Sequence, residues 1–388
     1  MKILMLSWEY PPKTEGELSN HVYNLSHKLS KLGHEIHIIT CEEGTEPIEE
    51  EDNGVFIHRV STYKIDTKDF TNWVMQLNFA MIEEGIRIIR NLGKFDIIHA
   101  HDWLVAFSAK TLKWSFNIPM ICTIHSTEHG KNNGIRTDMQ RYISSTEWLL
   151  TYEASRVIVC SNYMKSEVQT LFKIPSDKIC VIPNGVNAED FKLNFDKKEF
   201  RKKYAKEDEK IICFIGKHVF GKGVYLLVET APEIIHKFNN IKFVIAGVGP
   251  IRDELQERVI QMGLSEKVLF PGYLTKDERN KLYNVSNITV IPSLYEPFGI
   301  VALEAMAGGC PVVASDTGGL SEIVQHEENG FKFINGSRES LVYNICEALE
   351  NHDLCNKIRK KSMEDVKKKY SWNDVGKITE KAYFSIID

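Results

Sequence analysis

Residues 2–40 read "KILMLSWEYPPKTEGELSNHVYNLSHKLSKLGHEIHIIT" and contain a predicted strand, helix and strand in direct succession. The apolar run at 2–8 predicts a buried strand, and apolar residues from Val22 to Leu32 then recur at the spacing of one helix face. Gly33 follows as a stop signal, and "EIHIIT" is typical of the next strand. This succession favours a parallel sheet with helices on both faces.

The same alternation continues along the chain in two series. The first series adds the strand-like runs "FDIIHAHD", "PMICTIH", "SRVIVCS" and "KICVIPNG", and the second comprises "KIICFIG", "IKFVIAG", "KVLFPGY", "NITVIPS" and "CPVVASD". A charged stretch at 186–210 separates them and predicts a passage between domains with a short helix. We therefore expect two Rossmann-like, doubly wound α/β domains, at 1–190 and 191–371. The acidic run at 42–52 favours a solvated loop.

The composition excludes several functional classes. A formal net charge of -5, with no basic half, argues against general nucleic-acid binding. The eight cysteines include no CxxC pair and predict buried free thiols in a reducing, cytoplasmic setting. No run reaches the ~18 apolar residues of a membrane span, and the start of the chain leads into a strand rather than a signal peptide.

The most informative cluster is "SLYEPFGIVALEAMAGGCPVVASDTGGLSEIV" at 293–324. We expect Glu296 to end a strand, and Gly299 and Ile300 to open a helix, with Glu304 near the start of the same element. Helix-opening amides attract anions, and carboxylates accept hydrogen bonds from hydroxyl groups, so the pattern suits a nucleotide sugar. The alternative is that both glutamates only complement the helix dipole.

A second cluster, "FIGKHVFGKGVYLL" at 214–227, places Lys217 and Lys222 in a glycine-containing loop after a strand. Two ammonium groups there could neutralise the charge that develops on a departing diphosphate. The loop lacks the GxxxxGK[ST] pattern of a Walker sequence. Lysines on a solvated loop are the alternative.

In the first half, "HAHDW" at 99–103 and "TIHSTEHG" at 123–130 each follow a predicted strand. We expect Asp102 and His125 to face the cleft between the domains, whereas His99 and His101 can be satisfied core residues. No HExxH or closely spaced ligand set is present, and the sequence therefore predicts no metal site.

Together these motifs resemble the retaining glycosyltransferases of family 4, which have the GT-B architecture, and in particular the glycogen synthase-like members. The resemblance covers nearly the whole chain, and it rests on the order and spacing of "SWEYPPK", "HDW", "TIHSTE", "PNGV", "EPFGIVALEAM", "GGL" at 318–320 and "KYSW". It implies two Rossmann-like domains facing a central cleft. It also implies that a C-terminal helix, 372–388, packs back on the first, acceptor-side domain, while the second binds the nucleotide sugar.

The resemblance assigns donor-binding roles to five residues of the second domain. Glu296 would contact the hydroxyls of the donor sugar, and Glu304 would contact the ribose. The backbone amides of Phe298, Gly299 and Ile300 would hold the sugar and phosphate.

The resemblance also assigns the catalytic groups. Lys217 and Lys222 would neutralise the diphosphate, His125 would lie near the reacting carbon of the sugar, and Asp102 would orient the acceptor. The implied reaction retains the anomeric configuration without a protein nucleophile, unlike that of retaining glycosidases. It implies UDP-glucose or ADP-glucose as donor, a glucan or other sugar-containing acceptor, and neither a metal nor another cofactor.

Two positions depart from the family pattern. Gly16-Glu17-Leu18 stands where the family loop reads GGL, and Lys217 stands where the family has arginine, so the planar fork for phosphate is lost. A carboxylate ~4 Å from a diphosphate costs on the order of 4 kcal/mol, roughly a thousandfold in affinity. Alternatively, Thr14 and Glu17 fit a T-x-x-E capping box. We therefore expect a phosphate-binding loop of impaired function that includes Gly16 and Glu17.

The sequence thus predicts a hexosyltransferase that uses a nucleotide-diphosphate sugar, most simply a glucosyl donor. An alternative is a catalytically weak or inactive nucleotide-sugar-binding protein, which Glu17 and Lys217 favour. Another GT-B enzyme, such as a nucleotide-sugar epimerase or a phosphorylase, is disfavoured because the segment 293–324 so closely resembles the retaining transferases.

Overall fold

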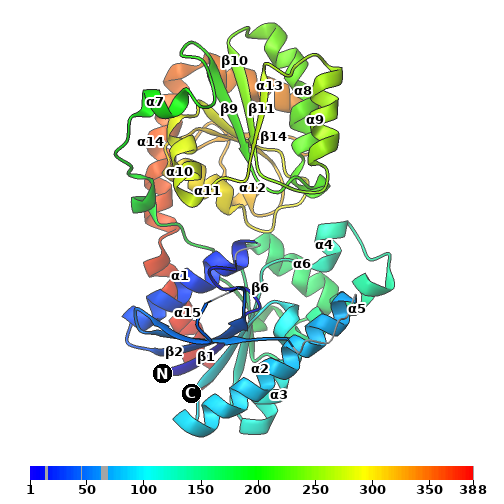
Figure 1. Cartoon of the computed structure of the whole chain (residues 1–388), viewed down its shortest axis with the longest axis vertical. Helices are drawn as coiled ribbons and strands as arrows, with labels where there is room; N and C mark the ends of the chain where they lie inside the picture. The colour runs from blue at the N-terminus through cyan, green and yellow to red at the C-terminus, as the bar shows by residue number, and fades with distance from the viewer. Residues whose placement is uncertain (14–15, 45, 63–68, 388) are drawn as a thin grey trace. The chain divides into compact units, whose positions relative to one another are not determined.

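The computed structural model of the chain divides into two compact units (Figure 1). Unit 1 comprises residues 1–184 and the residues from Trp372 on, and unit 2 comprises Gly185–Ser371. The structure describes residues 1–13, 16–44, 46–62 and 69–387. Each unit is built on one predominantly parallel sheet with helices packed against it, and the predicted α/β class is therefore confirmed.

The sheet of unit 1 has the strand order β3-β4-β2-β1-β5-β6-β7-β8. Its strands are β1 Lys2–Leu6, β2 Glu35–Cys41, β3 Glu49–Asp52, β4 Val55–Val60, β5 Ile97–His101, β6 Met120–Ile124, β7 Arg156–Val159 and β8 Ile179–Val181. Neighbouring strands are parallel except β3 and β4, which form an antiparallel pair. The chain order reverses at β1, which lies between β2 and β5.

The helices of unit 1 pack apolar side chains against this sheet, except the short α4, none of whose residues is buried. They are α1 Glu17–Lys31, α2 Phe70–Leu92, α3 Ala106–Phe116, α4 Glu128–Asn132, α5 Asp138–Glu153, α6 Asn162–Phe172 and α15 Trp372–Ile387, with short 3-10 turns at η1 Trp103–Val105 and η2 Ser176–Lys178. Val22, Leu25 and Leu29 of α1 share one buried cluster with Ile3 and Ile36 of the strands. Full burial of each such side chain contributes about 1.5–3 kcal/mol.

The C-terminal helix α15 belongs to unit 1 although it follows all of unit 2 in the chain. Its Tyr383 hydroxyl lies 2.7 Å from His99 Nδ1, and Glu380 Oε1 lies 2.8 Å from His34 Nε2. Trp372 and Val375 complete the apolar cluster around α1. The last helix therefore closes the core of the first sheet.

Unit 2 carries a six-stranded parallel sheet in the order β11-β10-β9-β12-β13-β14. The strands are β9 Lys210–Ile215, β10 Ile241–Ala246, β11 Val268–Gly272, β12 Ile288–Ile291, β13 Val312–Ser315 and β14 Phe331–Phe333. The helices are α7 Lys197–Arg201, α8 Val224–Lys237, α9 Arg252–Gln261, α10 Lys276–Val285, α11 Ile300–Ala307, α12 Leu320–Ile323, α13 Arg338–Glu350 and α14 His352–Lys369, with 3-10 turns at η3 Ala188–Phe191 and η4 Phe220–Lys222.

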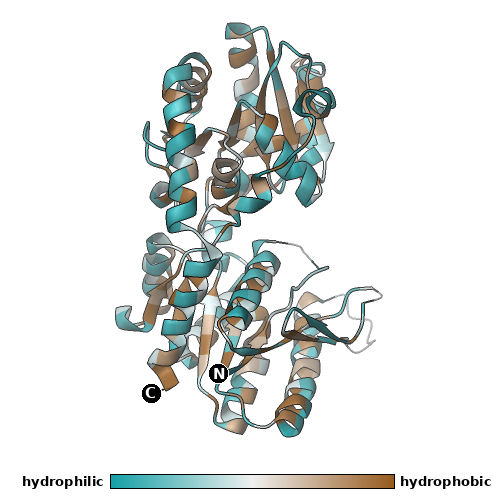
Figure 2. Cartoon of the chain, turned by 90° about the vertical axis from the view of Figure 1, so that its left-hand side faces the viewer, coloured by the Kyte–Doolittle hydropathy of each residue, from teal (hydrophilic) through white to brown (hydrophobic). Residues whose placement is uncertain are grey.

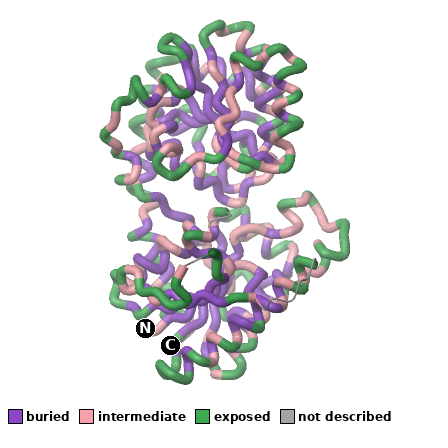
Figure 3. Tube along the Cα trace, in the orientation of Figure 1, coloured by how far each residue is buried: buried purple, intermediate pink, exposed green. Residues whose placement is uncertain are grey.

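Hydrophobic residues concentrate in the strands of both units, and the strands are the most continuously buried segments (Figures 2 and 3). All eight cysteines are free, and seven of them are buried, as predicted. No helix in the described part of the chain is long and apolar enough to cross a membrane.

Several local predictions were wrong. The acidic run at 42–52 is not simply a loop, because Glu49–Asp52 forms the mostly exposed edge strand β3. Strand β12 ends at Ile291, and Glu296 therefore lies in the following loop rather than at the strand end. Glu304 lies in the middle of α11 and not near its start.

Candidate functional site

The candidate residues lie in loops that follow the strands where the strand order of each sheet changes direction. The reversal lies between β1 and β5 in unit 1, and between β9 and β12 in unit 2. Loops that leave the carboxyl ends of such strands diverge, and they commonly form ligand sites in open α/β sheets.

Lys222 and Glu296 form an ion pair at the reversal point of unit 2. Lys222 Nζ lies 2.8 Å from Glu296 Oε2 and 3.1 Å from Oε1, and the Ser293 hydroxyl donates to Oε2 at 3.0 Å. The Glu296 side chain is only 3% exposed, whereas that of Lys222 is 29% exposed. A buried carboxylate is thus held by a lysine that still reaches solvent.

A tight backbone turn places Lys222 beside this carboxylate. Gly223 follows it with φ +64°, and a Cβ on Gly223 would lie 1.7 Å from the Pro292 carbonyl oxygen. The Leu294 amide donates to the Gly221 carbonyl at 2.8 Å, which joins the two loops. Only glycine permits this approach.

The start of α11 offers backbone donors next to the ion pair. Gly299, the N-cap, has φ +106°, and a Cβ there would lie 2.6 Å from Leu320 Cδ2. The amides of Phe298, Gly299 and Ile300 donate no backbone hydrogen bond to another described residue. The first amides of a helix have no intrahelical acceptor, and they attract anionic groups. The prediction that Gly299 and Ile300 open a helix is confirmed.

Glu304 has partners of its own in the interior of unit 2. Arg279 Nη2 lies 2.9 Å from its Oε1, and the Tyr283 hydroxyl lies 3.3 Å from its Oε2. Burial raises the pKa of Glu304, and the positive charge of Arg279 opposes that rise. Sequence reasoning missed Arg279, which lies on α10 and carries no motif.

Lys217 is exposed two residues beyond β9. Its carbonyl accepts a hydrogen bond from the Val219 amide, and its ammonium makes no ion pair with another described residue. The structure therefore brings Lys222, but not Lys217, into contact with Glu296.

In unit 1, Asp102 follows β5 and adopts an unusual backbone conformation. Its φ of +60° is rare for a residue with a side chain, and such strain is found preferentially at functional sites. Asp102 Oδ1 accepts a hydrogen bond from the His125 amide at 2.8 Å, which links the ends of β5 and β6. Burial raises the pKa of Asp102 to about 6.

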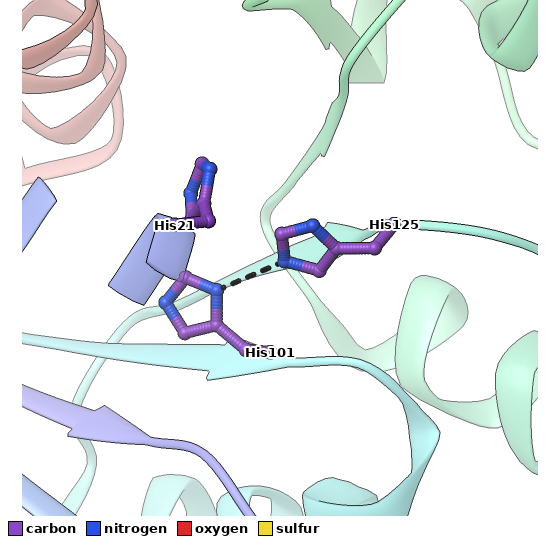
Figure 4. A group of neighbouring side chains, drawn as sticks. All are labelled: His21, His101 and His125. Carbon is purple, nitrogen blue, oxygen red and sulfur yellow. Dashed lines mark hydrogen bonds between the residues drawn. The ribbon is translucent and has the colours of Figure 1, made fainter. Parts of the chain in front are cut away.

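Three imidazoles gather beside Asp102: His21, His101 and His125 (Figure 4). His101 Nδ1 lies 3.4 Å from His125 Nε2. Burial lowers the pKa of His125 to about 4 and that of His21 to about 3. His99, by contrast, is a satisfied core residue, because both of its ring nitrogens have hydroxyl partners at 2.7 Å.

The loop after β1 holds a carboxylate that sequence reasoning missed. The Gly16 amide donates to Glu9 Oε2 at 3.0 Å, and the Glu9 side chain is buried. Gly16 is the N-cap of α1, and Glu17 is its first residue. The alternative capping box would place the N-cap at position 14, two residues before the observed N-cap Gly16; Thr14 itself lies outside the described residues. Glu17 instead adds a negative charge to the first turn, where it stabilises the helix.

Two doubly wound units, each with polar groups at its reversal point, form the architecture that the sequence resemblance implies, and comparison with known proteins identifies the class as sugar-transferring enzymes with the GT-B fold. Residues 18–190 match the Glycosyltransferase Family 4 domain, and residues 196–365 match the Glycosyl transferases group 1 domain. The chain belongs to the GT-B glycosyltransferases of the family-4 type, and it is a glycosyltransferase.

Similar proteins agree with this assignment over the full length of the chain. An uncharacterized glycosyltransferase of Methanocaldococcus jannaschii is 40% identical over 99% of this chain and 98% of its own length. The glycogen synthase of Mycobacterium tuberculosis is 30% identical over 99% of this chain and 95% of its own. The structure of Anabaena HepE in complex with UDP-glucose covers 100% of both chains with a TM-score of 0.81 and 17% identity, which shows a shared fold.

Proposed function

We propose that the protein transfers a hexose, with glucose as the first candidate, from a nucleotide-diphosphate sugar to a glucan or another sugar-containing acceptor. The observation that carries this proposal is the Lys222–Glu296 pair beside the open amides of α11. A cation and backbone donors suit a diphosphate, and a buried carboxylate suits sugar hydroxyls, so both halves of such a donor have partners of the right chemistry. The similarity to glycogen synthase supports glucose and a glucan.

The roles of the donor site follow from this geometry. Lys222 would offset the charge that grows on the diphosphate as the bond from the sugar C1 to the phosphate oxygen breaks. Glu296 would accept hydrogen bonds from sugar hydroxyls, and the amides of Phe298, Gly299 and Ile300 would donate to sugar and phosphate oxygens. Lys217 is exposed and could approach the diphosphate as the donor binds.

Glu304 and Arg279 would act at the other end of the donor. The carboxylate is buried and already accepts from Arg279 and Tyr283, and it would accept from the ribose hydroxyls. In unit 1, His125 would contact the donor sugar, and Asp102 would orient the acceptor hydroxyl.

The proposed reaction retains the configuration at C1. The acceptor oxygen would bond to C1 on the face from which the diphosphate leaves, and the acceptor proton would pass to the departing phosphate oxygen. Lys217 and Lys222 would supply the charge neutralisation that a metal provides in other phosphate chemistry, so we expect transfer without added metal.

The test is a transfer assay with UDP-glucose or ADP-glucose and a maltooligosaccharide acceptor, which measures nucleotide release and chain extension. Glu296→Gln should lower the rate at least a hundredfold, by analogy with the loss of one transition-state contact. Glu209→Gln is a matched control outside the site. Like Glu296, Glu209 is a buried glutamate, with its side chain 7% exposed, and it pairs with a partly exposed lysine, Lys267, whose side chain is 29% exposed. Glu209 lies directly before β9. Equal rates for the two variants would contradict the proposal.

A second candidate is a nucleotide-sugar-binding protein of little or no transfer activity. It is favoured by the loop after β1, where the Glu9 carboxylate accepts from the Gly16 amide and Glu17 opens α1. Donor binding without nucleotide release in the same assay would support this candidate.

A further inference from the structure

Three histidines from distant parts of the sequence converge in unit 1 (Figure 4). His21 lies on α1, His101 is the last residue of β5, and His125 directly follows β6. One ring nitrogen of each lies within 4.8 Å of a ring nitrogen of the other two. The His21 and His125 ring centroids are 4.7 Å apart. Three imidazoles at this spacing are a possible ligand set for a metal ion.

The closest pair already has a suitable separation. Two nitrogen ligands at 2.0–2.1 Å from a tetrahedral Zn²⁺ lie about 3.3 Å apart. His101 Nδ1 and His125 Nε2 are 3.4 Å apart. A ring nitrogen of His21 lies within 4.8 Å of both of the other ligand nitrogens.

The hydrogen bonds of His21 leave one nitrogen suited to a metal. Its Nδ1 lies 2.8 Å from the Asn184 carbonyl oxygen Oδ1, so Nδ1 carries the proton and Nε2 carries the lone pair. Metal-binding histidines usually donate their second ring N–H to such an oxygen, which fixes the tautomer and the ring orientation. Asn184 thus holds His21 in the form that a metal requires.

His101 has an incomplete set of partners. Its side chain is fully buried, and its Nε2 accepts or donates no hydrogen bond within the described part of the chain. His99, two residues earlier on the same strand, has partners for both nitrogens. The nitrogen of His101 that faces the cluster is Nδ1, and its only partner within the described part of the chain is the His125 imidazole. His101 thus differs from His99, whose two nitrogens both have hydroxyl partners.

The surroundings can accommodate a dication. His125 is half-buried, whereas His21 and His101 are buried. The Asp102 carboxylate is bonded to the His125 amide and would offset part of the added charge. An all-imidazole set selects Zn²⁺, Cu²⁺ or Ni²⁺ over Mg²⁺ and Ca²⁺, which prefer oxygen ligands.

We propose that His21, His101 and His125 form a transition-metal site that binds Zn²⁺ and leaves the fourth position to water. Transfer itself is expected to need no metal, and the proposed metal site shares His125 with the proposed donor site. Occupancy would withdraw His125 from the donor sugar and inhibit transfer; this consequence, but not the binding itself, rests on the proposed function.

The test is calorimetric titration of Zn²⁺ into the full chain without any sugar, with visible absorption of bound Co²⁺ as a second readout of tetrahedral nitrogen ligands. We expect one equivalent to bind with a Kd of 10 µM or below, as a rough design target for a three-ligand site. His21→Gln should weaken Zn²⁺ binding at least tenfold. If that variant does not fold, His125→Gln, a change at a half-buried loop position, provides the same test and should also weaken binding at least tenfold.

His58→Gln is a control variant in the other group of possible metal ligands among the described residues, which consists of Glu49, His58 and Glu84. Arg87 already pairs with both of these glutamates, so His58→Gln should bind Zn²⁺ like the parent. The proposal is overturned if the parent binds no Zn²⁺ at concentrations 100-fold above the target Kd. It is also overturned if the folded His21 and His125 variants bind Zn²⁺ as tightly as the parent, whatever His58→Gln does. Because no sugar is present, either result is independent of whether the protein transfers glucose.

Discussion

Removal of the Glu17 carboxylate is predicted to strengthen donor binding. Glu17 is the first residue of α1, directly after the Gly16 amide that a phosphate would otherwise approach. At ~4 Å and an effective dielectric of about 20, repulsion between one carboxylate and one phosphate charge is about 4 kcal/mol, or roughly a thousandfold in Kd. This is the upper bound for the gain, because salt screens exposed charges and the Glu9 carboxylate remains nearby.

Two substitutions separate the effect of charge from that of volume. Glu17→Gln removes the charge and keeps the size, whereas Glu17→Gly also opens the space beside the loop. Both should lower the free energy of unfolding by about 0.3–1 kcal/mol, because α1 loses a favourable charge in its first turn, and glycine should cost about 1 kcal/mol more through helix propensity.

The assay is calorimetric titration of UDP-glucose and ADP-glucose into the parent and both variants, at low and at high salt. If charge dominates, glutamine recovers most of the gain and the difference from the parent shrinks as salt rises. If volume dominates, only glycine recovers it. Equal donor affinities for all three proteins would refute the reasoning, since they would mean that Glu17 lies away from the bound diphosphate.

Three further predictions concern the stability of the site. Gly223→Ala should lower the free energy of unfolding by several kcal/mol, because its Cβ would collide with a backbone oxygen. Gly263→Ala, which also has a positive φ but open space around it, should lower the free energy of unfolding by only about 1 kcal/mol. Equal losses for the two variants in urea unfolding would contradict this prediction. Arg279→Met should lower the free energy of unfolding by about 3 kcal/mol, because it leaves the buried Glu304 carboxylate with only the Tyr283 hydroxyl as a partner. A decrease of less than about 1 kcal/mol in urea unfolding would contradict a stabilising Arg279–Glu304 ion pair. His125 has a folded pKa of about 4 against about 6.5 unfolded, so its contribution is present above pH 6.5 and is lost as the pH falls toward 4, by roughly 3 kcal/mol. His125→Gln should reduce the loss of stability over this range without abolishing it, because the pKa of the neighbouring His21 is also lowered, to about 3. An unchanged slope would argue against a neutral His125 ring in the folded protein.

The sequence predicts most of the sheets because parallel strands covered on both faces read as continuous apolar runs. Strand β3 escapes this pattern, since Glu49–Asp52 forms an exposed edge with no apolar residue. Strand β14 was missed because its three residues are too short for periodicity to be detected. The alternative capping box at Thr14 and Glu17 would have started α1 two residues too early, because a short local pattern does not fix the first residue of a helix.

The candidate site was predictable where it depends on loops that follow strands. Lys222 and Glu296 meet because β9 and β12 are neighbours, so their loops leave the same edge of one sheet. The partners contributed by helices were not predictable. Arg279 reaches Glu304 from α10, and His21 reaches the other imidazoles from α1, only because of how each helix packs on its sheet.

The measurement that tests the central claim most directly is proton NMR of the glycosidic product formed from UDP-glucose or ADP-glucose and a maltooligosaccharide. The account predicts release of the nucleoside diphosphate together with a new α-linked glucose, a signal absent with Glu296→Gln. A β-linked product, or no transfer by the parent and by Glu17→Gly with either donor, would contradict it.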